Sequence, residues 1–355
     1  MNAQMVDTTK LESFLTRAVG DLSAGHAGVM VSIGMKLGLY KAMSGAGPVS
    51  PRELAVRTGC AERYVREWLN AQVAGGYVDY HVISQTYELS TEQAMVLADE
   101  DSPFFMPYAW QVTASMWHDE EKTLEAFRSG RGVSWGDHDA RLYCGVASFY
   151  RNAYRSSLVS QWLPALDGVV EQLEAGMAVA DVGCGHGHST MLMAEAFPHS
   201  HFHGFDVHPG SIETARRHAV EAGLDGRVSF DVAPATGYCG DGYGLICFFD
   251  ALHDMGDPIA ALRHAGDALA PGGTVMAIEP FANDRLEDNI SPVARLYYSA
   301  SAALCCTNAI ADGGHLVLGA QAGEARLTDV FRKAGFRHMR RAAETPFNLV
   351  LEARR

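Results

Sequence analysis

The sequence is poor in positive charge. Its 355 residues include 28 lysine and arginine residues but 42 aspartate and glutamate residues, which gives a formal net charge of -14. Nucleic acids and anionic membranes attract basic surfaces, so we expect neither as a partner. The sequence also lacks an apolar run long enough to cross a bilayer, and its N-terminus lacks the pattern of a secretory signal. These absences predict a cytoplasmic protein that acts on a small molecule.

Paired cysteines are absent as well. The chain holds seven cysteines, an odd number, and none belongs to a C-x-x-C motif. This usage predicts neither a disulfide framework nor a structural zinc site. We expect reduced thiols that mostly pack in the interior.

The first hundred residues carry the pattern of a winged helix. Apolar residues recur at helical spacing over residues 10–43, which predicts two helices. Ser50-Pro51 begins a short helix that Gly59 breaks, and a second helix starts at Ala61. Strand-like residues follow on both sides of a turn near Ser84. Between residues 41 and 89, five basic residues balance five acidic ones. Because a DNA reader needs surplus cations, we expect a role in folding and dimerisation, with DNA binding as the alternative.

The rest of the chain divides into a helical stretch and an alternating one. Residues 94–165 contain helical segments rich in aromatic residues, which we expect to link two domains and wall off a pocket. A plain helical core is the alternative. From Ala178 onward, strand-like and helix-like segments alternate, which predicts a parallel sheet covered by helices on both faces. Ligands of such sheets bind beyond the carboxyl ends of the strands.

The segment AVADVGCGHGHST, residues 178–190, joins the first of these strands to its helix. Asp181 ends the strand, and glycines at 183, 185 and 187 permit positive φ angles and a close approach of ligand to free N–H groups. A dinucleotide fingerprint, G-x-G-x-x-G, is disfavoured because His188 stands where its third glycine belongs. Asp206 ends the next strand, 23 residues after Gly183, a spacing suited to ribose hydroxyls. The loop therefore predicts a ligand that carries a ribose.

A family resemblance rests on these residues. The D-x-G-x-G-x-G run at residues 181–187, Asp206 and the later LAPGGTVMAIEP at residues 269–280 resemble the class I S-adenosylmethionine-dependent methyltransferases over roughly residues 170–355. The segment FFDALHDMGDP, residues 248–258, together with the winged helix, is similar to plant caffeate-type and hydroxyindole O-methyltransferases and to related bacterial methyltransferases.

The resemblance implies an α/β fold with two domains and a linker. A Rossmann-like, doubly wound, mostly parallel seven-stranded sheet would be closed by a C-terminal hairpin, after a helical winged-helix N-terminal domain. We expect the winged-helix dimerisation domain over residues 1–95, a helical linker and pocket wall over residues 96–168, and the methyltransferase domain over residues 169–355.

The resemblance also implies roles for individual residues around S-adenosylmethionine. Asp181 and the backbone of the glycine loop would face its methionyl part, Asp206 would hold the ribose, and Val207 would lie against the adenine. Pro234-Ala235 stands where the family often has an acid next to an alanine, so the hydrogen bond to adenine is either absent or made by another residue. The expected cofactor-binding set is Asp181, Gly183, Cys184, Gly185, Gly187, Asp206, Val207, Pro234, Ala235, Phe249 and Asp250.

The acceptor side would lie after the fourth strand of the sheet. Phe249 and Asp250 would border the sulfonium, although Phe249 can also simply fill the core. His253-Asp254 matches the family's histidine-aspartate pair, in which the histidine is the general base. The ordinary pKa of histidine, near 6.5, predicts a largely neutral ring that can take a hydroxyl proton. Glu279 would orient the ring; a purely structural His253 is the alternative.

The expected reaction is methyl transfer from S-adenosylmethionine to a small organic acceptor, with S-adenosylhomocysteine as product and an oxygen acceptor preferred. Transfer to nitrogen, sulfur or carbon is one alternative; for a sulfur or a tertiary amine His253 would only position the acceptor. A winged-helix transcription regulator that senses S-adenosylmethionine is a second alternative, and an altered cofactor on the same fold is a third. We expect a homodimer formed through the N-terminal domain.

Two further groups of residues call for an explanation. His199, His201 and His203 alternate along a strand-like segment, a spacing that a metal can use, but no carboxylate or thiolate clearly completes a site, so we expect no metal. The segment of about 40 residues before the final helix is too long for a bare loop. We expect it to line the acceptor cavity, with candidates Tyr297 and Tyr298, and its vicinal Cys305-Cys306 to pack in a helix, with thiol chemistry as the alternative.

Overall fold

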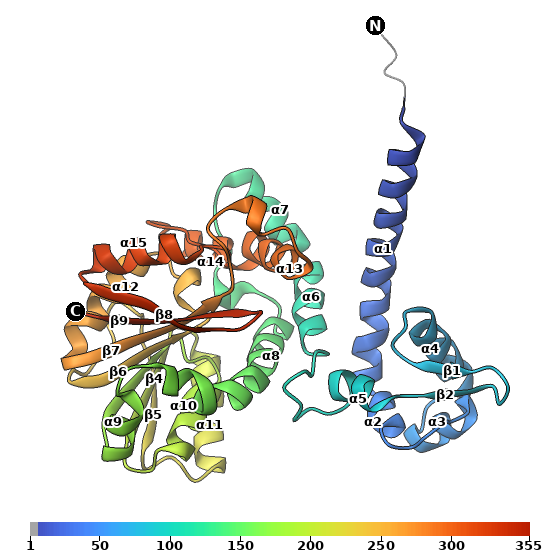
Figure 1. Ribbon diagram of the computed structural model, residues 1–355, viewed down its shortest axis with the longest axis horizontal. Helices are drawn as coiled ribbons and strands as arrows, with labels where there is room; N and C mark the ends of the chain where they lie inside the picture. Colours follow the sequence, from blue (N-terminus) through green and yellow to red (C-terminus); the bar gives the residue numbers. More distant parts are fainter. Residues whose placement is uncertain (1–5) are drawn as a thin grey trace, which may run out of the picture. The chain divides into compact units, whose positions relative to one another are not determined.

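A computed structural model describes residues 6–355, so the first five residues of the expected 1–95 domain lie outside the described residues. The described chain folds into two compact units (Figure 1). The first ends at Thr113 and the second spans Ala114–Arg355. Within the described residues, no helix is both long and apolar enough to cross a membrane.

The first unit has the predicted winged-helix order. It runs α1 Thr8–Lys36, α2 Leu39–Met43, α3 Pro51–Thr58, α4 Glu62–Ala74, β1 Asp79–His81, β2 Thr86–Glu88 and α5 Thr91–Leu97. The strands β1 and β2 pair antiparallel as the wing. Residues 10–43 form two helices as predicted, and the break between them lies at Gly38, whose φ of 66° ends the 29-residue α1.

Local sequence explains the helix-turn-helix. Ser50 and Glu53 form a capping box that starts α3. Gly59, with a φ of 69°, ends it in the left-handed conformation that glycine adopts without strain. On α4, the apolar residues Val65, Trp68 and Leu69 share one face and are buried in the core of this unit. Each of these helices has one apolar face and an otherwise largely polar surface, so burial of the apolar faces in this common core stabilises the small domain.

Helices connect this unit to the sheet. They are α6 Ala109–His118, α7 Glu120–Ser129, α8 Arg141–Ser157 and α9 Val169–Ala175, with a 3-10 turn at Trp135–Asp137, a π turn at Leu158–Trp162 and a 3-10 turn at Leu163–Ala165. The region between residues 94 and 165 is therefore helical, as predicted, and α8 carries its aromatic residues toward the sheet.

In the described chain, seven strands form one sheet in the order β5-β4-β3-β6-β7-β9-β8. The strands β3 to β7 run parallel, and β9 is antiparallel to both β7 and β8. This order confirms the predicted doubly wound sheet with a closing hairpin. The bounds are β3 Ala178–Val182, β4 His201–Asp206, β5 Val228–Val232, β6 Tyr243–Phe249, β7 Leu269–Pro280, β8 His338–Glu344 and β9 Asn348–Arg354.

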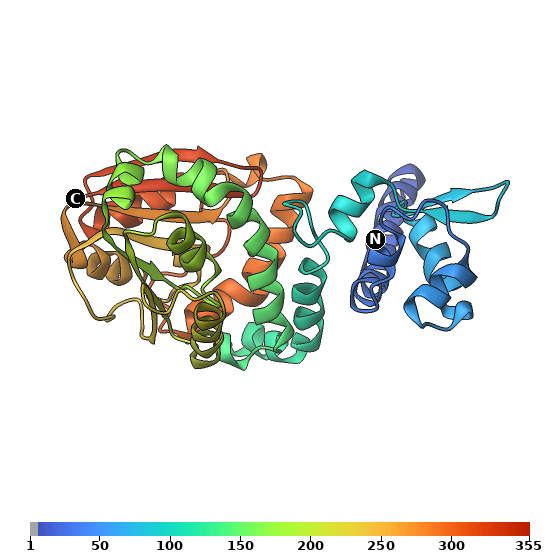
Figure 2. The same ribbon diagram turned by 90° about the horizontal axis from the view of Figure 1, so that it is seen from below.

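Helices cover both faces of the sheet, as Figures 1 and 2 show. Along β6, Leu245, Cys247 and Phe249 belong to one core cluster, while Ile246 and Phe248 belong to the other. Because side chains of a strand point alternately to opposite faces, a continuous apolar run serves both cores. The first core is covered by α9, α10 His188–Ala196 and α11 Pro209–Glu221, and the second by α12 Pro258–Ala268 and α15 Glu324–Ala334.

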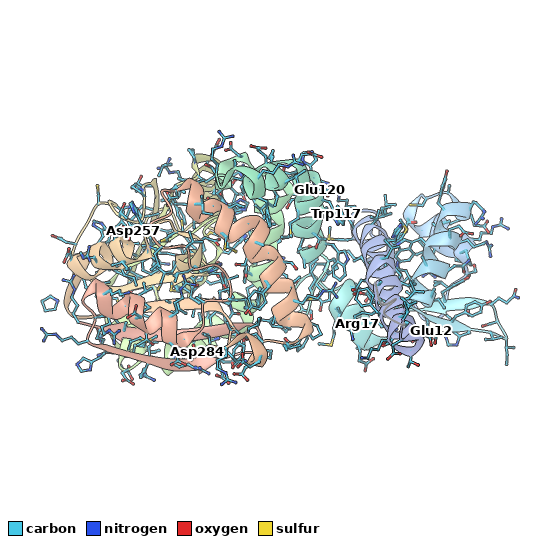
Figure 3. The ribbon with its side chains drawn as sticks, turned by 90° about the horizontal axis from the view of Figure 1, so that it is seen from above. Glu12, Arg17, Trp117, Glu120, Asp257 and Asp284 are labelled. Atoms are coloured by element: carbon cyan, nitrogen blue, oxygen red, sulfur yellow. The ribbon has the colours of Figure 1, made fainter. Side chains whose placement is uncertain are left out.

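Two aspartates labelled in Figure 3 help to start the helices of the second face. Asp257 accepts a hydrogen bond of 2.9 Å from the backbone N–H of Ala260 at the start of α12. Asp284 accepts one of 2.8 Å from Ala325 at the start of α15. Each carboxylate satisfies an N–H that the first helical turn leaves without a helical partner.

The residues Pro271-Gly272-Gly273, a sequence typical of a turn, lie within the strand β7. The structure has one strand from Leu269 to Pro280 instead of a turn followed by a strand. The pairing with β6 shifts between Tyr243 and Leu245, so that the extra residues of β7 bulge out there. Gly272 makes this possible with a φ of 78°.

The segment before the last helix is helical. It forms α13 Pro292–Ala300, a π turn at Ser301–Cys305 and α14 Cys306–Ala311. A π turn inside a helix often marks a functional position, because the extra residue redirects the side chains that follow. Here it contains Cys305, which is buried.

Candidate active site

The predicted site residues meet at one edge of the sheet. The strands β3 and β6 are neighbours, and the chain leaves β3 toward β4 on its other side. This is the switch point at which doubly wound sheets bind ligands, beyond the carboxyl ends of the strands. The glycine loop follows β3, Asp206 ends β4, Asp250 follows β6 and Glu279 lies near the end of β7.

The glycine loop requires its glycines for two different reasons. Gly183, Gly185 and Gly187 all have positive φ angles, of 81°, 53° and 76°. A Cβ atom on Gly183 would lie 2.6 Å from the Cβ of Ala251, and one on Gly187 would lie 2.6 Å from the ring of Phe230. At Gly185, by contrast, no described atom lies within 4 Å of such a Cβ. The loop is thus packed at its ends and open at its middle.

Asp181 lies fully buried beneath this loop. Its Oδ2 accepts hydrogen bonds from the hydroxyls of Ser189, at 2.7 Å, and Thr190, at 2.6 Å, in the first turn of α10. Its Oδ1 has no hydrogen-bond partner among the described residues. Burial raises the pKa of Asp181 to about 6. A buried carboxylate oxygen without a partner is costly, so it fits a ligand that brings a cationic donor.

Asp206 ties the glycine loop to β4. Its Oδ2 accepts a 2.9 Å hydrogen bond from the N–H of Gly185, and its Oδ1 accepts one of 2.8 Å from the N–H of His208. Burial raises the pKa of Asp206. Since a carboxylate offers about four lone-pair sites, both oxygens keep capacity for further donors.

The remaining predicted cofactor residues surround this pair. Val207 is 59% exposed, Pro234 is exposed and Ala235 is partly buried, so they present an apolar surface beside Asp206. Cys184 differs from them because its side chain is buried in the core. Burial raises the pKa of the Cys184 thiol, so only the backbone of this residue belongs to the loop surface.

Phe249 and Asp250 end β6 in different ways. Phe249 is buried, with its ring centroid 5.4 Å from that of Tyr154 on α8. Asp250 has a φ of 49°, a conformation uncommon outside glycine. Its carboxylate accepts hydrogen bonds from the Tyr154 hydroxyl, at 3.0 Å, and from Nδ2 of Asn348, at 2.9 Å. Burial, with repulsion from the Glu279 carboxylate, raises the pKa of Asp250 to about 8.

His253 lies buried on a 3-10 turn, Leu252–Asp254. Its Nδ1 is 2.7 Å from Oε2 of Glu279, whose Oε1 accepts a hydrogen bond from the N–H of Leu252. The predicted contact that orients the ring is therefore confirmed. Its Nε2 is 3.2 Å from a carboxylate oxygen of Asp254.

The expectation of an ordinary pKa for His253 is wrong. Burial by itself lowers the pKa of a histidine, because the charged form loses its water. Here the carboxylates of Asp254 and Glu279 outweigh burial and hold the pKa of His253 well above its usual value. The sequence placed both acids near the ring but could not show that both would touch it.

Aromatic residues and a cysteine enclose the same region. Tyr150 and Tyr154 of α8 stack at a centroid distance of 5.9 Å. Tyr297 of α13 is buried and donates to the carbonyl of Phe347 at 3.1 Å. Tyr298, the other predicted candidate, is 37% exposed. Cys305 is buried, and its Sγ lies within 4.8 Å of a ring nitrogen of His253.

The three alternating histidines lie elsewhere. His201 and His203 are in the first half of β4, at the edge opposite to Asp206, where they help to line a cavity of about 370 Å³. Nε2 of His203 is 2.8 Å from the Asp231 carboxylate. The group that the described residues do bring together with metal-ligand spacing is another one: His253, Asp254 and Cys305, whose donor atoms lie within 4.8 Å of one another.

The structure adds four residues to the site that the sequence patterns did not single out. Ser189 and Thr190, which hold Asp181, had a local signal, since two hydroxyl residues directly follow the glycine loop at a helix start. Tyr154 and Asn348, which hold Asp250, had none, because they lie 96 and 98 residues from it in the chain.

Comparisons with known proteins agree with this architecture. Residues 25–99 match the family model of the Rv2258c-like winged HTH domain, and residues 173–335 match a methyltransferase domain. Ubiquinone biosynthesis O-methyltransferase of Ruegeria pomeroyi is 30% identical over 99 residues, which cover 28% of this chain and 39% of the relative. Methyltransferase GfsG of Streptomyces halstedii is 29% identical over 133 residues, 37% of this chain and 48% of the relative. The chain thus spans less than half the length of these relatives.

Solved structures share the fold over nearly the whole chain. The mitomycin 7-O-methyltransferase MmcR aligns with a TM-score of 0.70 at 20% identity, covering 98% of this chain and 100% of that one. Human N-acetylserotonin methyltransferase, solved in complex with SAM, aligns with a TM-score of 0.67 at 17% identity, covering 100% and 99%. The two family models, the strand order and the glycine loop together identify an N-terminal winged HTH domain followed by a methyltransferase domain with the class I fold.

Proposed function

We propose that this protein transfers a methyl group from S-adenosylmethionine to a hydroxyl group of a small organic acceptor, with His253 as the general base. The observation that carries the proposal is the buried His253–Glu279 pair at 2.7 Å, in which His253 lies four residues beyond the carboxyl end of β6. A base fixed in this way next to a cofactor edge is what proton removal from a hydroxyl requires.

The residues at the sheet edge fit S-adenosylmethionine. The unpartnered Oδ1 of Asp181 suits the cofactor's ammonium group, and the open backbone at Gly185 leaves room for its methionyl part. Asp206 has lone pairs left for ribose hydroxyls. Val207 and Pro234 offer apolar surface to the adenine. The bound cofactor supplies an electrophilic methyl group on a sulfonium, and S-adenosylhomocysteine is the expected product.

The protein's own part in the chemistry is proton transfer and shielding. Glu279 accepts the Nδ1 proton of His253, which fixes the ring and raises the basicity of Nε2. Only the neutral ring can act as a base, so His253, whose pKa is raised, must first release its Nε2 proton. Nε2 then takes the proton of the acceptor hydroxyl as the oxygen attacks. The buried rings of Tyr154 and Phe249 exclude water from this edge. For a sulfur or tertiary amine acceptor, which needs no base, His253 would position the acceptor.

The surface of α4 argues against the transcription-regulator alternative. In a winged helix that reads DNA, the second helix of the motif needs free cations to meet phosphates. Here Arg63 forms an ion pair with Glu67, and Arg66 forms one with Glu62. The cations of this helix are thus neutralised by their own neighbours, and the net charge of -14 adds to the repulsion. We infer that the winged helix serves folding and association, and that the protein acts in the cytoplasm.

We further propose that the protein is a homodimer through α1. Six exposed apolar residues of this helix follow one another at intervals of three and four, apart from one gap at His26, which is the spacing of a coiled-coil seam; Phe14, 68% exposed, lies outside this series. Charged residues lie at positions of α1 between these apolar residues; Glu12 and Arg17, labelled in Figure 3, are two of them. A second copy offers the same stripe, so the surface is self-complementary. The six exposed apolar residues of this series are Leu11, Leu15, Val19, Leu22, Val29 and Ile33.

One experiment tests the reaction directly. The full-length protein is incubated with methyl-labelled S-adenosylmethionine and a panel of phenols, carboxylic acids, amines and thiols, and products are identified by mass spectrometry. Label found on a hydroxyl oxygen, and strongly reduced by His253→Gln, is the expected result. Cofactor binding without product, together with tight and specific binding to promoter DNA in a gel-shift, would instead establish the regulator.

A further inference from the structure

A cluster of three different donor groups lies beside the proposed base. A ring nitrogen of His253, a carboxylate oxygen of Asp254 and the Sγ of Cys305 lie within 4.8 Å of one another. The first two come from the 3-10 turn after β6, and Cys305 comes from the π turn after α13. His253 and Cys305 are buried and Asp254 is partly buried, so the cluster is largely shielded from solvent.

The chemistry of these donors selects the ion that they suit. Imidazole nitrogen, thiolate sulfur and a carboxylate are ligands of Zn²⁺, whereas Mg²⁺ and Ca²⁺ take oxygen ligands almost alone. Three protein ligands fill three of the four tetrahedral positions of zinc. The fourth position stays open for water or for the oxygen of another molecule.

The surroundings of the ring match those of a zinc-bound histidine. Such histidines use one ring nitrogen for the metal and donate the other N–H to a carboxylate. Nδ1 of His253 is engaged by Glu279 at 2.7 Å, which leaves Nε2 for the cluster. The Oδ1 of Asp254 lies 3.2 Å from this Nε2 and has no hydrogen-bond partner among residues 6–355.

The separation of the donors is compatible with a shared ion. Bonds of about 2.0–2.3 Å place tetrahedral zinc ligands about 3.3–3.8 Å apart. The three donors therefore have to approach one another by about 1.5 Å at most, which side-chain rotation of Asp254 and Cys305 can supply.

We propose that His253, Asp254 and Cys305 form a binding site for a zinc-class divalent cation, and that the bound ion inhibits the enzyme by occupying Nε2 of His253. The site itself stands on the cluster alone. The inhibition rests on the proposed function, because it requires His253 to be the base. An ion on Nε2 takes the lone pair that would otherwise accept the proton of the acceptor.

The binding test uses the full chain, ZnCl₂ and CoCl₂ alone, without cofactor. Zinc stoichiometry is measured by equilibrium dialysis with metal analysis, and Co²⁺ reports a thiolate ligand through its charge-transfer absorption. The matched pair is Cys305→Ser and Cys306→Ser: Sγ of Cys306 lies 3.5 Å from the hydroxyl of Ser301, outside the cluster. Thermal unfolding checks that both variants are folded.

We expect one zinc equivalent and a thiolate band in the wild type and in Cys306→Ser, and the loss of both in Cys305→Ser and in His253→Ala. Glu279→Gln should weaken zinc binding about 10- to 100-fold. A zinc equivalent retained by Cys305→Ser would overturn the site, since it would belong to exposed thiols such as Cys144 or Cys239. A wild type that binds no zinc would overturn it as well.

Inhibition is measured separately, by titrating zinc into the methyl-transfer reaction. Loss of turnover at one equivalent, restored by a chelator, is the expected result. Zinc that binds at one equivalent but leaves turnover unchanged would refute the inhibition and the base role of His253 together, while the metal site would stand. The metal site can therefore stand when the inhibition fails, and each is tested by its own measurement.

Discussion

At the scale of single residues, the site depends on buried carboxylates whose partners are few and specific. Glu279 fixes His253, Asp206 closes the glycine loop, and Asp181 keeps one oxygen without a partner. Each of these groups costs free energy to bury and is stabilised only by the contacts it makes. Substitutions at these positions therefore separate the two tasks of holding the cofactor and moving a proton.

We predict that His253→Ala lowers turnover by about 10²-fold or more and leaves cofactor affinity intact. The reason is that His253 contacts Glu279 and Asp254 but neither the glycine loop nor Asp206. Steady-state kinetics and titration calorimetry measure the two quantities. His264→Ala is the control, because the ring of His264 packs against Tyr238 and its Nε2 lies 2.9 Å from the Tyr238 carbonyl, and neither residue belongs to the candidate site. Full residual turnover in His253→Ala would reduce this histidine to a scaffold residue.

Asp206→Ala should weaken cofactor binding by about 10- to 100-fold. A charged hydrogen bond contributes about 1.5–3 kcal/mol, and this residue is expected to hold the ribose. Calorimetry with the purified variant gives the affinity. Asp231→Ala, at the end of the neighbouring strand β5, removes an exposed carboxylate and should leave the affinity unchanged. Equal affinities in the two variants would rule out the ribose assignment.

Cofactor affinity should also depend on pH through Asp181. Burial raises the pKa of Asp181 to about 6, and only the ionised carboxylate attracts an ammonium group. Affinity should therefore rise as the pH increases through about 6 and level off above it. In the free protein the sign is opposite: because the folded-state pKa exceeds the unfolded value, this group's contribution to stability falls as pH rises from about 4 to about 6. Asp181→Asn should remove the pH dependence of binding; an unchanged profile would place the titrating group elsewhere.

At the scale of secondary-structure elements, the helical segments before the sheet are joined by another buried carboxylate. Asp119, between α6 and α7, accepts hydrogen bonds from Lys122 Nζ at 2.8 Å and from the N–H of Asp139 at 2.7 Å. The Nδ1 atoms of His118 and of His138 each lie 3.2 Å from this carboxylate as well. One side chain thus connects the start of α7 to the loop that leads into α8.

We predict that Asp119→Ala destabilises the protein by about 3 kcal/mol, because it leaves the buried ring of His138 and the partly buried N–H of Asp139 without their acceptor at once. Urea unfolding measures the change. Asp137→Ala is the control, since this neighbouring aspartate is exposed, and it should change stability by less than about 0.5 kcal/mol. A similar small effect at Asp119 would show that water replaces the carboxylate.

At the scale of the whole molecule, the proposed homodimer depends on the long exposed stripe of α1. The combined variant Leu15→Glu and Leu22→Glu should convert a dimer into a monomer of 38.3 kDa, because like charges would face each other across a symmetric seam. Light scattering after size-exclusion chromatography gives the mass. Val220→Glu, an exposed apolar position on α11, should leave the dimer intact. A dimer that survives the double variant would place the interface on another surface.

The sequence by itself determined the elements and the edge of the sheet at which the candidate site residues meet. Ser50 with Glu53, the glycines of the loop after β3 and the alternation along β6 are local patterns, and local backbone and burial preferences suffice to interpret them. Asp181 and Asp206 could be assigned because parallel strands end at the same edge of a sheet. Even the contact of Glu279 with His253 followed from two consecutive strand ends.

Only the tertiary structure decided which side chains from distant parts of the chain contact the charged groups of the site. Tyr154 and Asn348 donate hydrogen bonds to Asp250 from elements that lie 96 and 98 residues away in the chain. Cys305 lies beside His253 because of a π turn that no sequence pattern predicts. Two carboxylates beside one imidazole then changed its pKa in a direction that the ordinary value of histidine did not predict. The physical reason is that packing sets dielectric and distance, and both depend on the folded arrangement of segments that are remote in the chain.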